Sequence, residues 1–337
     1  MPHTGVEEKT PWRNVPASVK SETARLLGSP VARATRAWGG YGPTPTYRLR
    51  LHDGRRAFLK GINAESNDFM RQAFIRELRI YRELPDILDG YAPEFLGSFV
   101  VEDWSVLLLE DLGPRTAPPW SASLARQVVT ELAVFHESTR GATLPAWLQT
   151  PGLAGSTEQN TWRCAFSVEE MAPSAALAGA KGGEAERWFQ EHGSVLTEAS
   201  RRLADPSFER TFIHRDVRSD NLRLVDGRLV LFDWPHASSA PPEFDMAAFA
   251  QAVKVEGGPD PQVVSEWYGA RWTVDQDALD ASVASLAGFF AVAARGPEIP
   301  GLPRLRSFVR AQLKVTLMWA ADRFRLPEPT WVDEIQT

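Results

Sequence analysis

The densest group of ionisable side chains in this sequence is the octet HRDVRSDN at residues 214–221. It contains Asp216 and Asn221, and a further carboxylate, Asp233, follows the apolar stretch LRLVDGRLVLF. Carboxylate and carboxamide oxygens are hard ligands that suit magnesium, which takes its remaining ligands from water and phosphate groups. A carboxylate that stays free of the metal can accept the proton of a substrate hydroxyl. These residues therefore have the chemistry for a metal-assisted reaction at a hydroxyl group.

A β-hairpin is the element that must position these groups. Asp226 and Gly227 interrupt the apolar stretch after the octet, and this pair predicts a tight turn between two short strands. Such a turn brings the outer strand ends together, so Asn221 and Asp233 are expected to lie close, with Asp216 one loop away. Taken singly, each of these residues has an ordinary alternative as a turn or helix-cap residue.

A second set of polar residues lies in the first third of the chain. Lys60 ends the short apolar run AFLK, which follows a hairpin turn predicted at Asp53 and Gly54. Further on, residues 66–84 carry apolar side chains at helical spacing, and Glu77 falls on the same stripe. A carboxylate on a buried face is costly unless it is paired. Glu77 is therefore expected to need a partner.

The pattern of elements predicts an α+β fold in two parts. Residues 31–112 fit four or five strands and one long helix, and a further helix is expected at 17–27. Beyond Gly113 the sequence is mainly helical, with one small hairpin and a mixture of loops and short helices at 145–183. The longer helices are expected at 123–139, 184–203, 243–254, 276–294 and 302–325. The boundary is placed near residue 113, between a strand-rich part at 1–112 and a helical part at 113–337.

Composition limits the classes of function. The chain has 337 residues, of which 43% are hydrophobic and 24% charged, as in globular proteins. Its formal net charge of −6 provides no basic surface for nucleic acid. No segment has the apolar length of a membrane span or a signal peptide, so we expect a cytoplasmic protein without membrane contact, as a monomer or weak dimer. Cys164 is the only cysteine, which excludes internal disulfides.

The order of these motifs resembles the protein-kinase-like fold, with its strand-rich N-terminal lobe and mainly helical C-terminal lobe. HRD, four residues, Asn, an apolar strand and Asp are similar to the catalytic and metal-binding loops of that fold. The match is closer to the aminoglycoside phosphotransferase family of small-molecule kinases, whose members show HxDxxxxN followed by a strand and a metal-binding Asp. Asp233 is followed by Trp234 and Pro235, and no APE segment follows. These departures argue against a protein kinase.

The resemblance implies a nucleotide site in the first part of the chain. Lys60 would hold the nucleotide phosphates, and Glu77 would be its ion-pair partner on the long helix. Backbone groups in the run that follows VLLL would bind adenine, and the residues concerned are Glu110, Asp111 and Leu112. The loop WGGYGPTPTY departs from a strict GxGxxG, but its glycines would let backbone amides approach phosphates. These glycines are Gly39, Gly40 and Gly42.

The resemblance also implies catalytic roles for the octet. Asn221 and Asp233 would hold Mg²⁺, while Asp216 would orient the acceptor hydroxyl and take its proton. Arg218 would stabilise charge on the transferred phosphoryl group, or would be a plain surface arginine.

The expected activity is ATP-dependent phosphorylation of a hydroxyl on a small molecule, such as an aminoglycoside-like antibiotic, an amino alcohol or a sugar. Acidic residues such as Glu158, Glu169 and Glu170 would attract a cationic acceptor, or would form a solvated acidic face. The alternative function is a catalytically silent nucleotide-binding regulator of the same fold.

Overall fold

The computed structural model describes residues 9–37, 44–148, 165–299 and 302–337. The chain divides into two compact units. The first comprises Met1–Thr116, Asp220–Pro235 and Ile299–Arg304, and the second comprises Ala117–Ser219, His236–Glu298 and Leu305–Thr337. The hairpin after the octet thus belongs to the same unit as the strand-rich part, although it lies far beyond residue 113 in the sequence.

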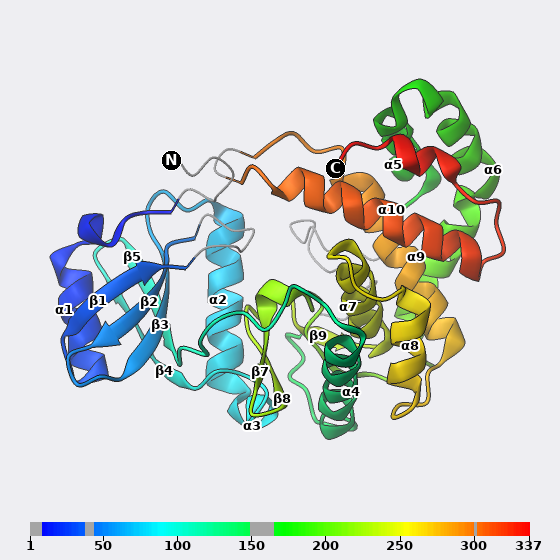
Figure 1. Cartoon of the computed structure of the whole chain (residues 1–337). Coiled ribbons are helices and arrows are strands. Elements are labelled where there is room, and N and C mark those ends of the chain that lie inside the picture. The colour runs from blue at the N-terminus through cyan, green and yellow to red at the C-terminus, as the bar shows by residue number, and fades with distance from the viewer. Residues whose placement is uncertain (1–8, 38–43, 149–164, 300–301) are drawn as a thin grey trace. The chain divides into compact units, whose positions relative to one another are not determined.

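A five-stranded antiparallel sheet forms most of the first unit (Figure 1). Its strands are β1 (Val31–Arg36), β2 (Thr46–Leu51), β3 (Arg56–Ile62), β4 (Phe95–Val101) and β5 (Trp104–Leu109), in the order β1-β2-β3-β5-β4. The turn between β2 and β3 contains Gly54 with φ of +88°, a left-handed conformation that glycine adopts without strain. The predicted hairpin and the predicted number of strands are confirmed.

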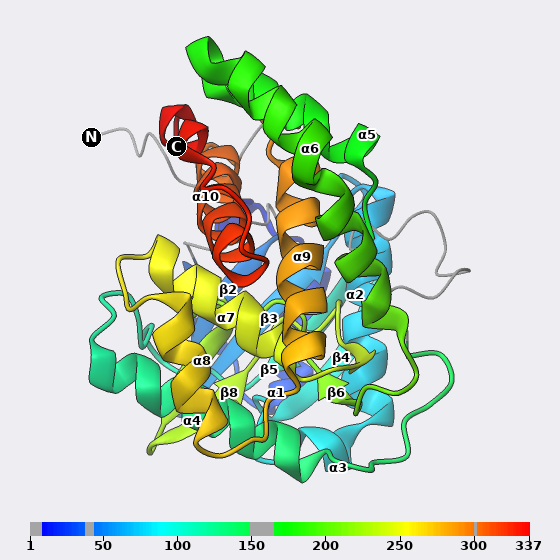
Figure 2. The same cartoon turned by 90° about the vertical axis from the view of Figure 1, so that its right-hand side faces the viewer.

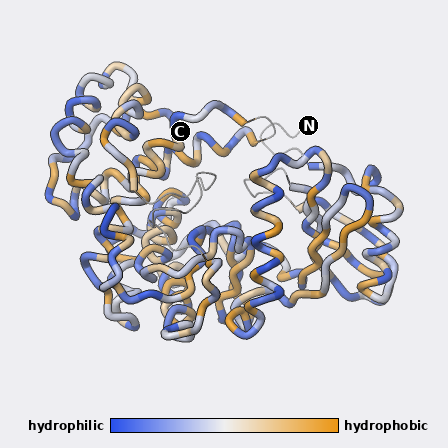
Figure 3. The backbone as a smooth tube through the Cα atoms, turned by 180° about the vertical axis from the view of Figure 1, so that it is seen from behind, coloured by the Kyte–Doolittle hydropathy of each residue, from blue (hydrophilic) through white to orange (hydrophobic). Residues whose placement is uncertain are grey.

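The two faces of this sheet have different surroundings. Side chains alternate between the faces along each strand, so Tyr47 and Leu59 point to one side. They are buried there with Leu27 of helix α1 (Ala17–Leu27). Figure 3 shows hydrophobic and hydrophilic stretches mixed along the chain of this unit. Lys60 follows Leu59 and therefore lies on the other face, where helix α2 packs (Figure 1).

Helix α2 (Asp68–Glu83) has the predicted amphipathic pattern. It begins after Asn67, whose side chain accepts a hydrogen bond from the Met70 N–H at 2.9 Å. Its buried residues form one stripe and are Phe74, Glu77, Ile80 and Tyr81. Two short helices, η1 (Trp12–Asn14) and α3 (Pro85–Leu88), complete this part of the unit. The predicted helix with Glu77 on its buried stripe is confirmed.

The hairpin after the octet consists of β7 (Leu222–Val225) and β8 (Arg228–Leu231), preceded by η4 (Ser219–Asn221). Both turn residues are left-handed, with φ of 51° at Asp226 and 83° at Gly227, which is the twist that a two-residue hairpin turn requires. The Phe232 N–H donates to the Asn221 carbonyl at 3.0 Å. This bond fixes the two outer ends of the hairpin against each other.

The second unit is mainly helical. Its long helices are α4 (Ala122–Ser138), α6 (Gly182–Arg201), α7 (Glu243–Val255), α8 (Pro261–Gly269), α9 (Gln276–Ala293) and α10 (Leu305–Arg323). Its short elements are α5 (Val168–Met171), η2 (Ala172–Lys181), η3 (Arg202–Ala204), η5 (Thr330–Glu334) and the paired strands β6 (Thr211–Ile213) and β9 (Ser238–Ala240). Figure 2 shows α9 among these helices, packed against α6, α7 and α10.

The longer helices confirm the predicted pattern, while α8 and the β6–β9 pair were not predicted. Helix α8 has nine residues and each of the two strands has three, so their sequences are too short for a clear periodicity. Among the described helices, none is both long and apolar enough to cross a membrane.

Helix α7 carries a buried carboxyl group at its first residue. Glu243 is 2% exposed, and its Oε1 accepts hydrogen bonds from Trp272 Nε1 at 3.2 Å and from the Asp275 N–H at 3.1 Å. Burial raises the pKa of Glu243 from 4.5 to about 7. The folded protein therefore binds more protons here than the unfolded chain between these two pH values, and its stability falls as pH rises through that window.

Replacing this carboxyl group by an amide tests the linkage. Glu243→Gln keeps an oxygen acceptor for Trp272 and Asp275 and removes the titration. Between pH 5 and pH 8, the wild-type free energy of unfolding is expected to fall by roughly 2–3 kcal/mol more than that of the variant. Urea denaturation at the two pH values measures both. Equal pH dependence of the two proteins would contradict the assignment.

Candidate functional site

The Lys60 ammonium group joins three elements of the first unit. It donates from β3 to Glu77 Oε2 on α2 at 2.5 Å and to Asp233 Oδ1, just beyond the hairpin, also at 2.5 Å. Lys60 and Asp233 are 173 positions apart in the sequence. The structure therefore brings together three residues that the sequence marked separately, and Glu77 has the partner that its burial requires.

The electrostatics of this triad follow from its burial. Glu77 is 1% exposed, and burial raises its pKa although the adjacent Lys60 ammonium opposes this effect. Burial acts to lower the pKa of Lys60, but the Asp233 and Glu77 carboxylates outweigh it, so the pKa is raised. Lys60 therefore remains a cation at neutral pH. One ammonium group therefore serves two carboxyl groups.

Asp233 is the exposed member of the triad. Its side chain is 42% exposed, whereas the Glu77 side chain is 1% exposed. Its backbone is left-handed, with φ of 68°, a conformation that few residues other than glycine adopt. Arg76 of α2 anchors the following segment, because its Nε donates to the Pro235 carbonyl at 2.9 Å. The chain is thus held in an uncommon conformation so that the carboxylate is presented outward.

Asn221 lies next to the backbone segment that carries Asp233. The hydrogen bond from the Phe232 N–H to the Asn221 carbonyl places Asn221 next to the residue that precedes Asp233. The prediction that Asn221 and Asp233 lie close together is confirmed.

The side chains at these two positions carry donor atoms of the kind that magnesium prefers. An aspartate and an asparagine provide two hard oxygen donors, and magnesium commonly takes one or two protein ligands with phosphate and water. Among the described residues, no three His, Cys, Asp or Glu side chains gather into a site that could hold a metal by protein ligands alone. The donor set therefore suits a metal that arrives with phosphate oxygens.

The segment after β5 is held by its own contacts. The Glu110 N–H donates to the Glu94 carbonyl at 2.9 Å. The Asp111 carboxylate accepts from Arg48 Nε at 2.9 Å and forms an ion pair with Arg48 Nη2 at 2.8 Å, and it also accepts from the Gly113 N–H at 3.1 Å. Because its side chain is engaged, Asp111 has only backbone groups to offer to a nucleotide. Leu112 lies between these anchored residues, and Gly39, Gly40 and Gly42 lie outside the described residues.

The first half of the octet belongs to the second unit. The Asp245 carboxylate of α7, which is fully buried, accepts from the His214 N–H and the Arg215 N–H, both at 2.6 Å. Two hydrogen bonds to main-chain N–H groups satisfy a buried carboxylate well. These two bonds brace the start of the octet against α7. His136 approaches the same carboxylate, with Nε2 at 3.4 Å.

Asp216 and Arg218 contact each other in the second unit. Arg218 Nη2 lies 3.2 Å from Asp216 Oδ2, and the guanidinium group lies 5.9 Å from the ring centre of Phe308 on α10. The two side chains are 12% and 15% exposed, so the carboxylate is partly shielded and has a cation beside it. Arg218 is thus more than an isolated surface arginine.

Glu256, which was not predicted from the sequence, holds the octet near its C-terminal end. Its carboxylate accepts from the Ser219 hydroxyl at 2.6 Å and from Trp120 Nε1 at 2.7 Å. In the sequence, a glutamate at the end of a helix indicates a solvated residue. Its partner Trp120 lies 136 positions away, so no local pattern predicts this contact. Arg48 was missed for the same reason, since its partner Asp111 is 63 positions away.

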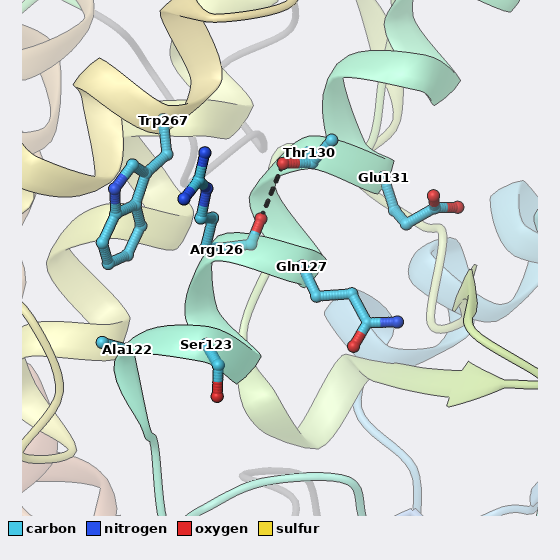
Figure 4. A pocket seen from close by; sticks show the side chains of 7 residues that line it. All are labelled: Ala122, Ser123, Arg126, Gln127, Thr130, Glu131 and Trp267. Carbon is cyan, nitrogen blue, oxygen red and sulfur yellow. Dashed lines mark hydrogen bonds between the residues drawn. The ribbon is translucent and has the colours of Figure 1, made fainter.

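A surface groove of about 470 Å³ lies elsewhere, between α4 and α8 of the second unit. Figure 4 shows that the Arg126 and Trp267 side chains face each other across it, and that the Thr130 hydroxyl is bonded to the Arg126 carbonyl. That bond is 2.8 Å long and lies within one helix. The groove contains none of the residues that the sequence marked for chemistry, so we assign it no catalytic role.

Removal of the Lys60 charge tests the triad. Lys60→Met leaves the buried Glu77 without a cation, so the free energy of unfolding is expected to fall by roughly 3–5 kcal/mol. Lys60→Met combined with Glu77→Leu is expected to recover most of this loss. Chemical denaturation of the two single variants and the double variant gives the coupling energy.

A surface ion pair provides the matched control. Lys254 and Asp260 also lie 2.5 Å apart, but their side chains are 42% and 66% exposed. Lys254→Met is expected to change the free energy of unfolding by less than about 1 kcal/mol. Similar losses for Lys60→Met and Lys254→Met would show that the triad is an ordinary surface contact.

Solved structures share this fold. An amicoumacin kinase, hAmiN, has a TM-score of 0.56 at 13% identity, covering 89% of this chain and 94% of that chain. A spectinomycin phosphotransferase, APH(9)-Ia, has a TM-score of 0.55 at 15% identity, with coverage of 94% and 97%. An aminoglycoside phosphotransferase from Alicyclobacillus acidocaldarius has a TM-score of 0.54 at 16% identity, with coverage of 88% and 92%. At these identities the likeness establishes the fold, which is the α+β fold of the protein-kinase-like enzymes.

A search of curated proteins gives no match. The model of a protein family described as the phosphotransferase enzyme family matches residues 33–281, which include Lys60, Glu77, the octet and Asp233. Since the match spans most of the chain and agrees with the fold, the chain belongs to this phosphotransferase family, that of the aminoglycoside phosphotransferases and related small-molecule kinases.

Proposed function

We propose that this protein transfers the terminal phosphoryl group of ATP to a hydroxyl of a small molecule. The observation that carries the proposal is the Lys60 ammonium group between Glu77 and Asp233, which gives one cation fixed by a buried carboxylate and one exposed carboxylate beside it. Relatives support the nucleotide: the amicoumacin kinase was solved with AMP-PNP and Ca²⁺, and the spectinomycin phosphotransferase with ADP and spectinomycin.

The first unit would bind the nucleotide. Lys60 would bind the phosphates, and Glu77 would fix the direction of the ammonium group, because its buried carboxylate accepts a hydrogen bond from Lys60 Nζ at 2.5 Å. Backbone groups of the anchored segment after β5 would bind the base, and Gly39, Gly40 and Gly42 would bring backbone amides to the phosphates. The segment concerned is Glu110, Asp111 and Leu112.

Asn221 and Asp233 would hold Mg²⁺. When bound, this ion neutralises phosphate charge and polarises the bond to the transferred group. The outward carboxylate of Asp233 and its fixed backbone suit this role, because a ligand held in place loses little conformational entropy on binding.

The second unit would supply the groups that act on the acceptor. Asp216 would orient the hydroxyl and take its proton as the bond to phosphorus forms. Arg218, which contacts the Asp216 carboxylate, would stabilise negative charge on the transferred phosphoryl group. The Asp245 carboxylate holds the backbone of the loop just before Asp216. The direction of the Asp216 side chain would therefore be set before a substrate binds.

Acceptors of the proposed class are aminoglycoside-like antibiotics, amino alcohols and sugars. Of the acidic residues considered for a cationic acceptor, Glu158 lies outside the described residues, and Glu169 and Glu170 lie in the first turn of α5. Glu170 forms a capping box with Ser167, whose N–H donates to Glu170 Oε2 at 2.9 Å. Hydrogen bonding to Ser167 lowers the pKa of Glu169. The acceptor therefore has to be found by screening.

Loss of a metal ligand tests the reaction. A screen that pairs MgATP with hydroxyl compounds, followed by ADP release, identifies an acceptor. Asp233→Ala is then expected to lower magnesium-dependent turnover by roughly 10³-fold or more, since a metal ion contributes several kcal/mol to such a transition state. Asp216→Asn is expected to lower kcat with little change in the KM for ATP.

Matched measurements separate the outcomes. Asp226→Asn, at the exposed turn of the same hairpin, is the control that should retain turnover and melting temperature. Near wild-type turnover of Asp233→Ala would refute the assignment of Asp233. Stabilisation by MgATP with no acceptor-stimulated ADP release would favour the nucleotide-binding regulator instead.

A further inference from the structure

Arginines gather around the segment 111–116 of the first unit. Arg48 on β2 pairs with Asp111, as described above. Arg115 precedes Thr116, whose hydroxyl accepts from the Leu224 N–H of β7 at 2.8 Å. Arg223 is the neighbour of Leu224, so this bond places Arg115 and Arg223 close together. The short segment after β5 is therefore flanked by guanidinium groups from β2, from its own end and from the hairpin.

Arg223 stands out within this group. It occupies a strand whose other residues are Leu222, Leu224 and Val225. Its guanidinium carbon lies 4.9 Å from the ring centre of Phe232, and its Nη1 donates to the Leu222 carbonyl at 2.6 Å. Within the described part of the chain, it forms no ion pair with a carboxylate and its buried Nε has no acceptor. A partly buried cation of this kind costs free energy unless a ligand uses it.

Two arginines and two carboxylates contribute to the electrostatic surroundings of Arg223. Burial and the nearby Arg115 and Arg48 lower the pKa of Arg223 to about 10, while Asp220 and Asp111 oppose this effect. The guanidinium group still carries its charge at neutral pH, and its environment favours electron-rich groups. Nη1 uses one of its two N–H groups for the Leu222 carbonyl, so its second N–H and the two N–H groups of Nη2 remain as donors.

The Lys60 face of the sheet is turned toward this hairpin. Phe58 lies two residues before Lys60 on β3 and so points to the same face. Arg48 is paired with Phe58 across β2 and β3, which directs it to that face as well. Lys60 contacts Asp233, the residue after Phe232. The phosphate-binding ammonium group, a phenyl ring and the Arg223–Phe232 stack thus belong to one surface region of the first unit.

We infer that Arg223 contacts the purine base of the nucleotide and favours a base with hydrogen-bond acceptors on its edge, so that GTP and ITP bind at least as tightly as ATP. The inference rests on the proposed function and adds the identity of the base. Guanidinium planes are good stacking partners for bases. Arginine is a donor only, and guanine and hypoxanthine offer it two acceptors, O6 and N7. Adenine places a donor, its amino group, where O6 would be.

Nucleotide affinity without an acceptor is the direct test. Calorimetry with MgGTP, MgITP and MgATP on the full chain is expected to give dissociation constants for GTP and ITP equal to or below that for ATP. Because a bidentate arginine contact with guanine discriminates by roughly 10-fold to 100-fold, Arg223→Leu is expected to weaken GTP and ITP by at least about 10-fold relative to ATP. Arg223→Lys keeps the charge but loses the planar fork, so it should lose the same selectivity.

Two further measurements keep the result independent of folding defects. Arg228→Leu removes an exposed arginine from the same hairpin and should leave all three affinities unchanged. With the wild-type chain, 7-deaza-GTP lacks the N7 acceptor and should bind more weakly than GTP.

Wild-type binding to ATP that is tighter than to GTP would overturn the inference and leave the proposed function standing. An unchanged GTP-to-ATP ratio in folded Arg223→Leu, or equal affinities for GTP and 7-deaza-GTP, would overturn it too. No binding of any of the nucleotides would overturn both.

Discussion

The first unit depends on one ammonium group. Lys60 lies on the strand face opposite the apolar core, so its charge is available to groups from outside the sheet. It stabilises a carboxylate on the buried stripe of α2 and fixes a second one beyond the hairpin. Because an unpaired buried charge is so unfavourable, the carboxylate of Glu77 needs this cation beside it. The ion pair therefore links the strand, the helix and the residue after the hairpin at one point.

The chain passes from one framework to the other within the octet. Ser219 is the last residue of one segment of the second unit, and Asp220 begins a segment of the first. The residues before this point are held by Asp245 and Glu256, whereas those after it are held by the β7–β8 ladder. Groups proposed to act on the acceptor and groups proposed to hold the metal thus have separate supports.

Local sequence patterns predicted those helices, strands and turns that depend on residues close together in the sequence. The Asp-Gly turns, the strand alternation and the stripe with Glu77 each depend on residues a few positions apart, and all three are confirmed. The order of the motifs then predicted the family. Contacts between distant segments left no such pattern, so Arg48 with Asp111 and Glu256 with Ser219 were not found. Arg223 is visible in the sequence as a cation within an apolar strand, but only its neighbours in the structure indicate a role for it.

The brace at the start of the octet has a consequence for how this loop can evolve. Asp245 binds the main-chain N–H groups of residues 214 and 215 and not their side chains. Every amino acid except proline carries that N–H. The buried His214 side chain adds a contact of its own, because its Nδ1 accepts from the Asp216 N–H at 3.2 Å. The anchor from Asp245 depends on neither side chain, and proline is the one substitution at these two positions that removes the N–H it binds.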